Sequence, residues 1–564
     1  DFCLSRGLGD VYKRQVRYSK AVKVPQDFPT IQEAIETTNL GIYGGEATIL
    51  VSNGTYNEYD LLIQNMLTSL TLTGESTPTT TISGDPAFVG VWANVENVTI
   101  KSLTITNSYI AVQLWGDNCI VSSSRITTST YGIRVIAYYN NTVRDNIVSQ
   151  NSGYAINLGS SSGNTIINNT SSYNKYGLYM GGVNKTLVSG NTIANNTYGI
   201  WIASSNEDVL TNNALTGNTY GFGVQGFSLS NFIHNIDTTN TVDGKPIYYL
   251  INQSNLVIDP PSSYANAGYL GLVNSTGITV RDLTLSKNLQ GVMFAFTKDS
   301  NIQNVKTLYN TYGICFYYSN STFITKNTVT DDYYGVYTWK SINNSITQNI
   351  LSKDTYGIYL SGSSDINILG NNITKTSRGI SVYSSNGNVI YHNNLISNTR
   401  QVYSSLSSNS WDFGAEGNYW SDYTGQDLNG DGIGDTAYVI DANNRDSYPL
   451  KKPWAVYALN LRVMDWDLTD GIQGAYVYAD SYVKISDANG WANWTEISDR
   501  TVYVKAGWYG AWVSGTFLVV VDSNKTINIQ SKIFDIAVTA IEGEQSAVLQ
   551  YVNVTVFNAS GSMI

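Results

Sequence analysis

The chain has 564 residues and a net charge of −11 at neutral pH, and only 13% of its residues are charged. It carries no basic stripe of the kind that binds nucleic acid. No run approaches the roughly 18 consecutive apolar residues of a membrane-spanning helix, so we expect neither a nucleic-acid partner nor a transmembrane segment.

The first residues of the chain differ from everything that follows. Residues 1–15, DFCLSRGLGDVYKRQ, match no later pattern and resemble translated sequencing-adapter read-through, so we treat them as a non-native artefact. The next signal is TIQEAIE at 30–36, where Thr30 and Glu33 form a capping box and the apolar residues share one face. This pattern predicts a short helix that covers the start of the fold.

A 22-residue repeat follows, marked by a Tyr-Gly-hydrophobic step. The glycines of this step are spaced by 22 residues in two series: Gly177, Gly199 and Gly221, then Gly291, Gly313, Gly335, Gly357 and Gly379. Asparagines keep the same spacing: Asn169, Asn191, Asn213 and Asn235, then Asn327, Asn349, Asn371 and Asn393. Self-similarity at a fixed period of this length predicts a stacked solenoid.

Each repeat reads as about three short strands separated by turn-forming residues. Strands that return after 22 residues fit one coil of a parallel β-helix, with coils about 4.8 Å apart. We expect the repeated glycines at corners with positive φ, and the repeated asparagines in a stacked amide ladder.

The register of both markers slips by four residues within 236–290, where we expect a protruding loop. The solenoid is assigned to 16–450, and the Trp- and Tyr-rich stretch 403–450 is expected to close its far end.

Three landmarks occur in order and resemble one family. VPQDFPTIQEAIE…GTYNE (24–58) looks like the opening of right-handed parallel β-helix proteins. NFIHNIDTTNTVDGKPIYYLINQSNLVI (231–258) and GNYWSDYTGQDLNGDGIGDTAYVIDANNRDSYPL (417–450) are similar to the NosD-like family, which is abundant in archaeal surface proteins. The resemblance implies an all-β right-handed parallel β-helix and an extracytoplasmic location, either at the cell surface, secreted or periplasmic.

The sequence pattern changes beyond Pro453. Residues 456–530 resemble a carboxypeptidase-regulatory-like (transthyretin-type) β-sandwich, and 533–564 resemble the first strands of a CARDB-type Ig-like domain that is cut short. Such modules are expected to act as spacers. Numerous N-x-S/T acceptors, among them Asn195 and Asn343, fit an exported glycoprotein.

The loop DLNGDGIGD at 427–435 predicts a structural Ca²⁺ site. Oxygen ligands alternate around a glycine turn, as a hard cation requires. The predicted ligands are Asp427, Asn429, Asp431, the Ile433 carbonyl and Asp435. The last EF-hand position is Tyr438 rather than a carboxylate, so Asp441 or Asp422 would have to complete the shell.

The family label is periplasmic copper binding, but the sequence does not favour copper. Its two histidines, His234 and His392, and its five methionines show no close pairing. Cys119 and Cys315 lie far apart in the repeats, and we expect buried free thiols, with Cys315 pointing inward.

Two columns of the repeat are candidates for function. Asp332 and Asp354 are 22 residues apart and should stack, which resembles the carboxylate pair of a retaining glycosidase. In the adjacent column Asp331 is followed 22 and 44 residues later by Lys353 and Lys375, which makes a surface ion-pair ladder the simpler interpretation. The tyrosine column could bind sugar or could only stack between coils; its members are Tyr131, Tyr154, Tyr176, Tyr198, Tyr220, Tyr312, Tyr334 and Tyr356.

These observations favour an extracytoplasmic structural or adhesive β-helix protein that binds a polysaccharide or cell-surface glycan along its length. A polysaccharide-active lyase or hydrolase is the first alternative, but neither a Gly-His-Gly nor an Arg-x-Lys signature supports it. A copper-binding accessory protein is the second.

Overall fold

The computed structural model describes residues 21–39, 46–64 and 69–531, except 263, 265, 466, 499, 509, 510 and 513, together with 541–542 and 547–548. The chain divides into two compact units, residues 1–453 and 454–564. The adapter-like residues 1–15 and nearly all of the CARDB-like stretch 533–564 lie outside the described residues.

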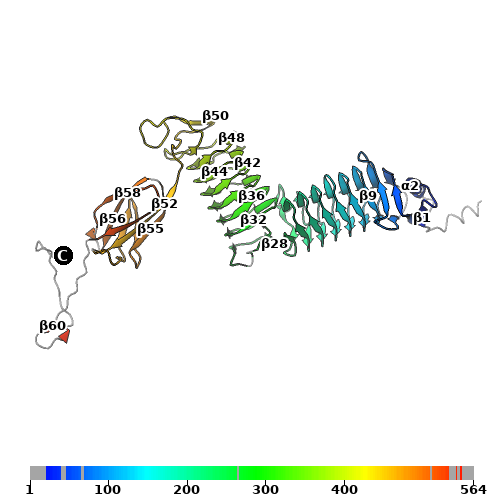
Figure 1. Cartoon of the computed structure of the whole chain (residues 1–564), viewed down its shortest axis with the longest axis horizontal. Coiled ribbons are helices and arrows are strands. Elements are labelled where there is room, and N and C mark those ends of the chain that lie inside the picture. The colour runs from blue at the N-terminus through cyan, green and yellow to red at the C-terminus, as the bar shows by residue number, and fades with distance from the viewer. Residues whose placement is uncertain are drawn as a thin grey trace, which may run out of the picture. The chain divides into compact units, whose positions relative to one another are not determined.

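The first unit is a parallel β-helix, visible in Figure 1 as rows of stacked arrows. It consists of two coil segments, which we call the N-terminal segment (21–242) and the C-terminal segment (245–420). Each full coil contributes one strand to each of three parallel sheets, named A, B and C in the N-terminal segment and A′, B′ and C′ in the C-terminal segment.

The sheets of the N-terminal segment follow one another in chain order. Sheet A contains β1 (Ala21–Val24), β2 (Glu46–Val51), β5 (Ser69–Gly74), β8 (Val98–Lys101), β11 (Ile120–Ser122), β14 (Thr142–Arg144), β17 (Thr165–Ile167), β20 (Leu187–Ser189), β23 (Val209–Thr211) and β26 (Asn235–Ile236). Sheet B contains β3 (Gly54–Tyr56), β6 (Thr80–Ser83), β9 (Thr104–Thr106), β12 (Arg125–Thr127), β15 (Ile147–Ser149), β18 (Thr170–Ser172), β21 (Thr192–Ala194), β24 (Ala214–Thr216) and β27 (Thr241–Val242). Sheet C contains β4 (Leu61–Ile63), β7 (Val89–Ala93), β10 (Ile110–Leu114), β13 (Tyr131–Ile136), β16 (Tyr154–Gly159), β19 (Tyr176–Gly181), β22 (Tyr198–Ala203) and β25 (Tyr220–Gln225).

The C-terminal segment repeats the arrangement. Sheet A′ contains β29 (Val257–Ile258), β31 (Thr279–Arg281), β34 (Asn301–Gln303), β37 (Phe323–Thr325), β40 (Ser345–Thr347), β43 (Asn367–Leu369) and β46 (Val389–Tyr391). Sheet B′ contains β32 (Thr284–Ser286), β35 (Lys306–Leu308), β38 (Thr328–Thr330), β41 (Ile350–Ser352), β44 (Asn372–Thr374), β47 (Asn394–Ile396) and β49 (Tyr419–Trp420). Sheet C′ contains β28 (Lys245–Ile251), β30 (Tyr269–Val273), β33 (Gln290–Ala295), β36 (Tyr312–Tyr317), β39 (Tyr334–Trp339), β42 (Tyr356–Ser361), β45 (Arg378–Tyr383) and β48 (Arg400–Ser405).

Alternation along each strand decides which residues form the core. In β19, Leu178 and Met180 are buried inside the coil, while Tyr179 between them faces outward. The ladder pairs equivalent residues of successive coils, so Leu178 meets Ile200 and Met180 meets Ile202. The core is therefore a set of apolar columns that run along the helix axis.

The repeated glycines do not take positive φ, contrary to our expectation. None of the Tyr-Gly glycines in the two 22-residue series has positive φ. They are needed because the next coil comes close: a Cβ on Gly177 would lie 2.5 Å from the Ile193 side chain and 2.8 Å from the Gly199 carbonyl oxygen. Left-handed corners are instead held by residues such as Asn168, Asn195 and Gly217.

The predicted asparagine ladder is confirmed. Asn191 Nδ2 donates to Asn213 Oδ1 at 2.9 Å, and Asn349 Nδ2 donates to Asn371 Oδ1 at 2.9 Å. One member was assigned wrongly: Asn213 donates to Asn240, not to Asn235. The chain between the two takes a longer path, because the 3₁₀ helix η1 (Leu229–Phe232) adds residues to this coil.

The register slip does not arise from a loop within 236–290. The extra residues lie at η1, because Leu210 in β23 already pairs with Ile236 in β26. The stretch between β29 and β30, which is described in part, contains no strand. Asp243 and Gly244, both with positive φ, make a tight turn, and β28 runs antiparallel to β27 before it begins sheet C′. The slip thus lies beside a junction between two coil segments. Phe227 and Phe232 pack there against the outer face of sheet C′, where the Tyr318 hydroxyl donates to the Phe227 carbonyl.

One cysteine at this junction is buried in a different core from the one we expected. The expectation that Cys315 points into its own coil is wrong. Its neighbours Ile314 and Phe316 enter the core of the C-terminal segment, whereas Cys315 faces the other way and joins the core cluster of the N-terminal segment. Cys119 and Cys315 are both buried free thiols, as expected.

The N-terminal helix α2 (Ile31–Asn39) covers the first coils, as predicted. Ile31, Ala34 and Ile35 are fully buried, and the Glu33 amide donates to Thr30 Oγ1 at 3.1 Å. The Glu58 carboxylate accepts two further amides of the first turn, Ile31 N and Gln32 N, each at 2.9 Å. The GTYNE motif therefore has a structural role, because its glutamate neutralises the positive end of the helix.

The far end of the helix is closed by residues 403–450. Trp411 and Trp420 are buried, and their indole N–H groups donate to Asn444 Oδ1 and Asp446 Oδ2. The two short strands here are β50 (Tyr438–Asp441) and β51 (Asn444–Asp446).

The second unit contains two sheets around one apolar core. One sheet contains β52 (Val456–Met464), β55 (Trp491–Ser498) and β59 (Lys525–Gln530), and the other contains β53 (Tyr476–Ala479), β54 (Tyr482–Ile485), β56 (Arg500–Trp508), β57 (Ala511–Trp512) and β58 (Phe517–Val521). A separate pair is formed by β60 (Ile541–Glu542) and β61 (Ala547–Val548). Among the described residues, no helix has the length and apolar character needed to cross a membrane.

Candidate functional site: an aromatic tract

A ladder of tyrosine rings lines the outer surface of sheet C. It starts at Tyr131 and continues through Tyr154, Tyr176, Tyr198 and Tyr220, each the first residue of its strand. The parallel register places these residues opposite one another. Consecutive ring centroids lie 4.4–5.2 Å apart, which is the range of offset stacking.

The ladder forms because a glycine follows each of Tyr131, Tyr176, Tyr198 and Tyr220. Without a Cβ at this position successive coils approach closely, and each ring lies flat against the next. The tyrosines are half-buried and keep one edge in solvent. Burial first, and neighbouring tyrosines second, raise the pKa of Tyr176 to about 12. The hydroxyls are therefore neutral hydrogen-bond donors and acceptors at neutral pH.

A second outward column runs beside the ladder on sheet C. It includes Trp92, Arg134, Tyr179 and Trp201, and it is half-buried. Three of its N–H groups are buried without a hydrogen-bond partner: Trp92 Nε1, Arg134 Nε and Trp201 Nε1. Buried donors without partners are costly, so their repetition in one column favours a ligand that supplies acceptors.

Sheet C′ carries a shorter ladder of the same kind. Tyr312, Tyr334 and Tyr356 stack with centroids 5.1 and 4.9 Å apart. Tyr337 and Tyr359 stack beside them at 5.7 Å. The column then changes from tyrosine to arginine, because Arg378 pairs with Tyr356 in the ladder and Arg400 pairs with Arg378.

The two ladders meet at the junction of the coil segments. The Phe222 ring of sheet C lies 4.9 Å from the Tyr269 ring of sheet C′, and the Phe222 amide donates to Asn288 Oδ1 at 3.2 Å. We call the two ladders and their flanking columns the aromatic tract. Sequence reasoning found the ladder tyrosines but missed Tyr179, Trp201, Tyr359 and the arginines. A search three residues after each ladder position would have found the first three.

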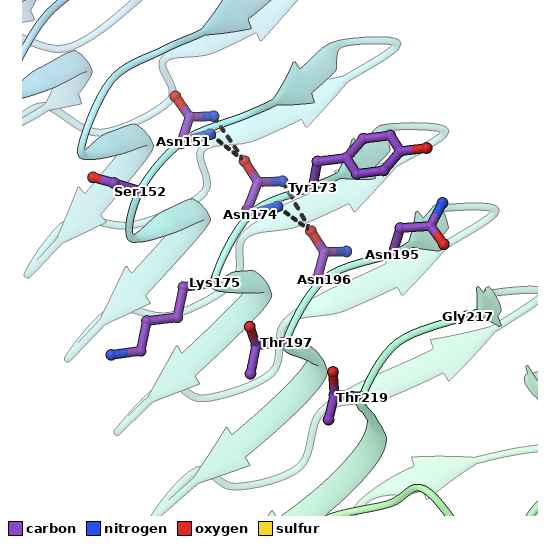
Figure 2. Close-up of a pocket in the computed structure, with 10 residues that line it drawn as sticks. All are labelled: Asn151, Ser152, Tyr173, Asn174, Lys175, Asn195, Asn196, Thr197, Gly217 and Thr219. Atoms are coloured by element: carbon purple, nitrogen blue, oxygen red, sulfur yellow. Dashed lines mark hydrogen bonds between the residues drawn. The ribbon is translucent and has the colours of Figure 1, made fainter.

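A shallow hollow of about 550 Å³ lies at the corner between sheets B and C, next to the ladder (Figure 2). The asparagine ladder of Asn151, Asn174 and Asn196 runs along it. Tyr173 and Lys175, on either side of Asn174, are exposed and point in different directions (Figure 2). The hollow offers amide, hydroxyl and ammonium groups beside the aromatic rings.

Asp332 and Asp354 do not lie on the tract. In the adjacent column, no ion pair within 4 Å links Asp331, Lys353 and Lys375 among the described residues. Asp332 and Asp354 are both 2% exposed and occupy the buried positions that asparagines hold in other coils. Asp332 accepts from Asn310 N and Thr307 Oγ1, and its own amide donates to Asp354 Oδ1. Burial raises the pKa of Asp332 to about 7 and, together with the Asp332 charge, that of Asp354 to about 9. Their side chains face the amides of the asparagine column inside the coil rather than the outer surface.

The calcium candidates form a loop that is closed by its own hydrogen bonds. Asp427 accepts from Gly430 N and Gly432 N, and Asp435 accepts from Leu428 N. Asn429 and Asp431 are exposed and bond to each other at 2.9 Å. Ile433 donates its amide to Asp431, and Asp441 accepts from Asn443 N and Asn444 Nδ2. In the part of the chain that the structure describes, no three His, Cys, Asp or Glu side chains gather at metal distance.

The histidines do not suit copper. His234 is buried, its Nδ1 accepts from Asp208 N, and its Nε2 bonds to the Asn231 carbonyl. His392 Nε2 bonds to Glu416 at 2.6 Å. Of the described methionines, Met180 and Met293 are fully buried core residues. These side chains are committed to structural contacts, so we derive no copper chemistry for this chain.

Comparison with known proteins identifies one family. The family model described as periplasmic copper-binding protein (NosD) matches residues 48–245 and 230–425. A search of curated proteins finds no match.

Solved structures with low similarity include three enzymes that act on polysaccharides. The mannuronan C-5 epimerase AlgE6 A-module of Azotobacter vinelandii is 15% identical, with a TM-score of 0.30, over 71% of this chain and 99% of that one. Pectin methylesterase PemA of Erwinia chrysanthemi is 15% identical, with a TM-score of 0.27, over 36% and 80%. The catalytic domain of a GH87 alpha-1,3-glucanase is 13% identical, with a TM-score of 0.31, over 72% and 70%. Similarity at this level supports no conclusion about activity.

Proposed function

Because the chain belongs to the NosD family, whose description is periplasmic, we propose that it is an extracytoplasmic β-helix protein that binds a polysaccharide along its aromatic tract. Binding serves display or adhesion rather than cleavage. The observation that carries this proposal is the continuous ladder of half-exposed tyrosine rings with partnerless N–H donors beside it.

The chemistry of the tract suits a sugar chain. Sugar rings present C–H faces that pack on aromatic rings, and their hydroxyls accept hydrogen bonds from indole and guanidinium N–H groups. The ladder repeats at the spacing of the coils, about 4.8 Å, so it offers equivalent contacts along an extended polymer. Many weak contacts in a row give useful affinity through effective concentration.

The same geometry argues against cleavage as the first choice. The stacked acidic pair suggested by the repeat is buried beneath the surface, where Asp332 and Asp354 contact ladder amides rather than solvent. If analysis of the polysaccharide after incubation detects reaction products, the protein is a polysaccharide-active enzyme instead.

Affinity electrophoresis in gels that contain soluble polysaccharides tests the proposal. We expect the full chain to be retarded, and the double variant Tyr198→Ala/Trp201→Ala to lose retardation, because a stacked aromatic pair is worth about 0.5–1.5 kcal/mol beyond its buried area. Tyr139→Ala is the matched control, since Tyr139 is 50% exposed and lies outside the tract.

Two results would contradict the proposal. If the folded protein is retarded by none of the polysaccharides, the tract is only a stacking device between coils. If new reducing ends or unsaturated products appear in the gel, the protein is an enzyme.

A further inference from the structure

Two arginines end the tyrosine column of sheet C′. Arg378 and Arg400 follow Tyr356 in the ladder register, and both contact the ring of Tyr403. The Arg378 guanidinium carbon lies 5.2 Å from the Tyr356 centroid and 4.6 Å from the Tyr403 centroid, and that of Arg400 lies 4.9 Å from the Tyr403 centroid. The rings hold the two cations side by side in adjacent coils.

These cations have no counter-ion in the part of the chain that the structure describes: neither has an acidic oxygen within 4 Å. The carboxylate of Asp422, on the adjoining cap, instead accepts a hydrogen bond from the Tyr438 hydroxyl. Arg400 Nε donates to the Val402 carbonyl, and its terminal nitrogens form no hydrogen bond with the residues that the structure describes. Like charges opposite each other on neighbouring strands repel, so an anion between the two guanidinium groups would relieve that repulsion.

A third group points to the same place. Ser381 lies between Tyr359 and Tyr403 in the ladder. Its neighbours Ile380 and Val382 enter the core, so Ser381 faces outward with the tract. It is nevertheless 0% exposed, and its hydroxyl has no hydrogen-bond partner. Ser381 pairs in register with Tyr403, whose ring both guanidinium groups contact, so a buried hydroxyl without a partner is a second, independent sign of a ligand there.

We propose that Arg378, Arg400, Ser381 and Tyr403 bind an anionic substituent on a sugar, either a uronate carboxylate or a sulfate ester. The inference rests on the proposed function, because it names the class of polysaccharide that the tract binds. Guanidinium forks match both oxyanions in geometry and charge. The tyrosine ladder holds the rings of the polymer, and the arginine pair selects acidic chains.

Affinity electrophoresis and titration of the full chain with polygalacturonate, dextran sulfate and neutral dextran test the site. We expect Arg378→Gln/Arg400→Gln to lose at least about tenfold in affinity for one or both acidic polymers, because each guanidinium–anion bond is charge-assisted. Its affinity for dextran should equal that of the wild type. Added salt should weaken acidic binding by the wild type more than by the variant.

Variants and controls separate charge from folding. Arg378→Lys/Arg400→Lys keeps the charge without the fork and should fall between wild type and the glutamine variant. Arg144→Gln removes an exposed arginine that pairs with Asp145, off the tract, and should change nothing. An unchanged thermal midpoint shows that each variant is folded.

The outcomes distinguish this inference from the proposed function. If the glutamine variant binds the acidic polymers as tightly as the wild type, the proposed anion site is wrong, whereas the proposal that the aromatic tract binds polysaccharide is unaffected. If the folded wild type binds none of the three polymers, the proposed function fails as well. Retention of polygalacturonate alone indicates a uronate site, and retention of dextran sulfate alone indicates a sulfate site.

Discussion

At the residue scale, the position of a side chain within the coil decides its role more than its residue type does. Asp332 and Asp354 look like a catalytic pair in the sequence, yet they occupy the buried column that asparagines hold elsewhere. An asparagine there accepts through Oδ1 and donates through Nδ2, as Asn310 does to Asp332. Ionised aspartate cannot donate. Asp354 Oδ2 has no partner, and burial, together with the Asp332 charge, raises the pKa of this carboxyl to about 9.

This raised pKa predicts that stability falls as pH rises. The folded state keeps a proton on Asp354 up to about pH 9, whereas the unfolded chain loses it near pH 4. The folded state therefore binds more protons in this window, and stability decreases between about pH 4 and pH 9. Asp332 adds the same trend up to about pH 7.

Asp354→Asn should remove much of this dependence and stabilise the protein above pH 7, by on the order of 1–3 kcal/mol. Urea unfolding at pH 5, 7 and 9 measures the effect. Asp299→Asn, at an exposed position, is the control. A lower stability of Asp354→Asn at pH 8 would contradict this account.

At the element scale, side chains at both ends of the β-helix accept hydrogen bonds from backbone amides that would otherwise be unpaired. Glu58 accepts the first amides of α2, and Asp446 accepts Asn418 N, the last step of an asparagine ladder. The helix was predictable from its capping box, because Thr30 and Glu33 are local. The partner Glu58 was not, because it lies 27 residues from Ile31 and reaches it only through the coil.

The loop 427–435 of the C-terminal cap gives a second prediction at this scale. We propose that Ca²⁺ binds there and stabilises the cap, because carboxylates and amide oxygens alternate around two glycines with positive φ, Gly430 and Gly432. Millimolar CaCl₂ should raise the thermal midpoint of the wild type by a few degrees. Asp427→Asn/Asp431→Asn should abolish the shift.

Asp365→Asn, an exposed residue in another coil, is the matched control for the calcium experiment and should keep the shift. Equal midpoints with calcium and with a chelator would mean that the loop is a polar turn that needs no ion.

At the scale of the whole molecule, stability is a sum over coils, because each coil contacts only its neighbours along most of the helix. The junction at 227–250 is the exception. There the N-terminal segment packs on the outer face of sheet C′: the Tyr317 ring contacts Phe232, and Cys315 belongs to the core cluster of the N-terminal segment. In sheet C′, aromatic side chains beyond the junction, such as Tyr356 and Tyr359, stay half-exposed.

This architecture predicts that one coil can be removed. Deletion of residues 345–366 brings Asn367 into the place of Ser345, its partner in the ladder register. The protein should remain folded and lose only the contribution of one coil. Deletion of residues 345–355, half a period, should abolish the cooperative transition, because it shifts inward residues out of the core. Circular dichroism during thermal unfolding compares the two, and equal effects would contradict the additive picture.

The amino-acid sequence by itself determined the period, the three strands per coil, the asparagine ladder and the N-terminal helix. Each of these depends on residues that recur at fixed spacing or lie within one turn of each other. Only the tertiary structure decided which columns face solvent. It buried Asp332 and Asp354, turned Cys315 outward into the junction, and located the register slip at η1, beside the junction between two coil segments. It also placed Arg378 and Arg400 over Tyr403, with no acidic oxygen of the described residues within 4 Å of either. The burial and the pairing of a side chain depend on neighbours that lie 22 or more residues away in the sequence. The spacing of residues in one column of the repeat does not reveal those neighbours.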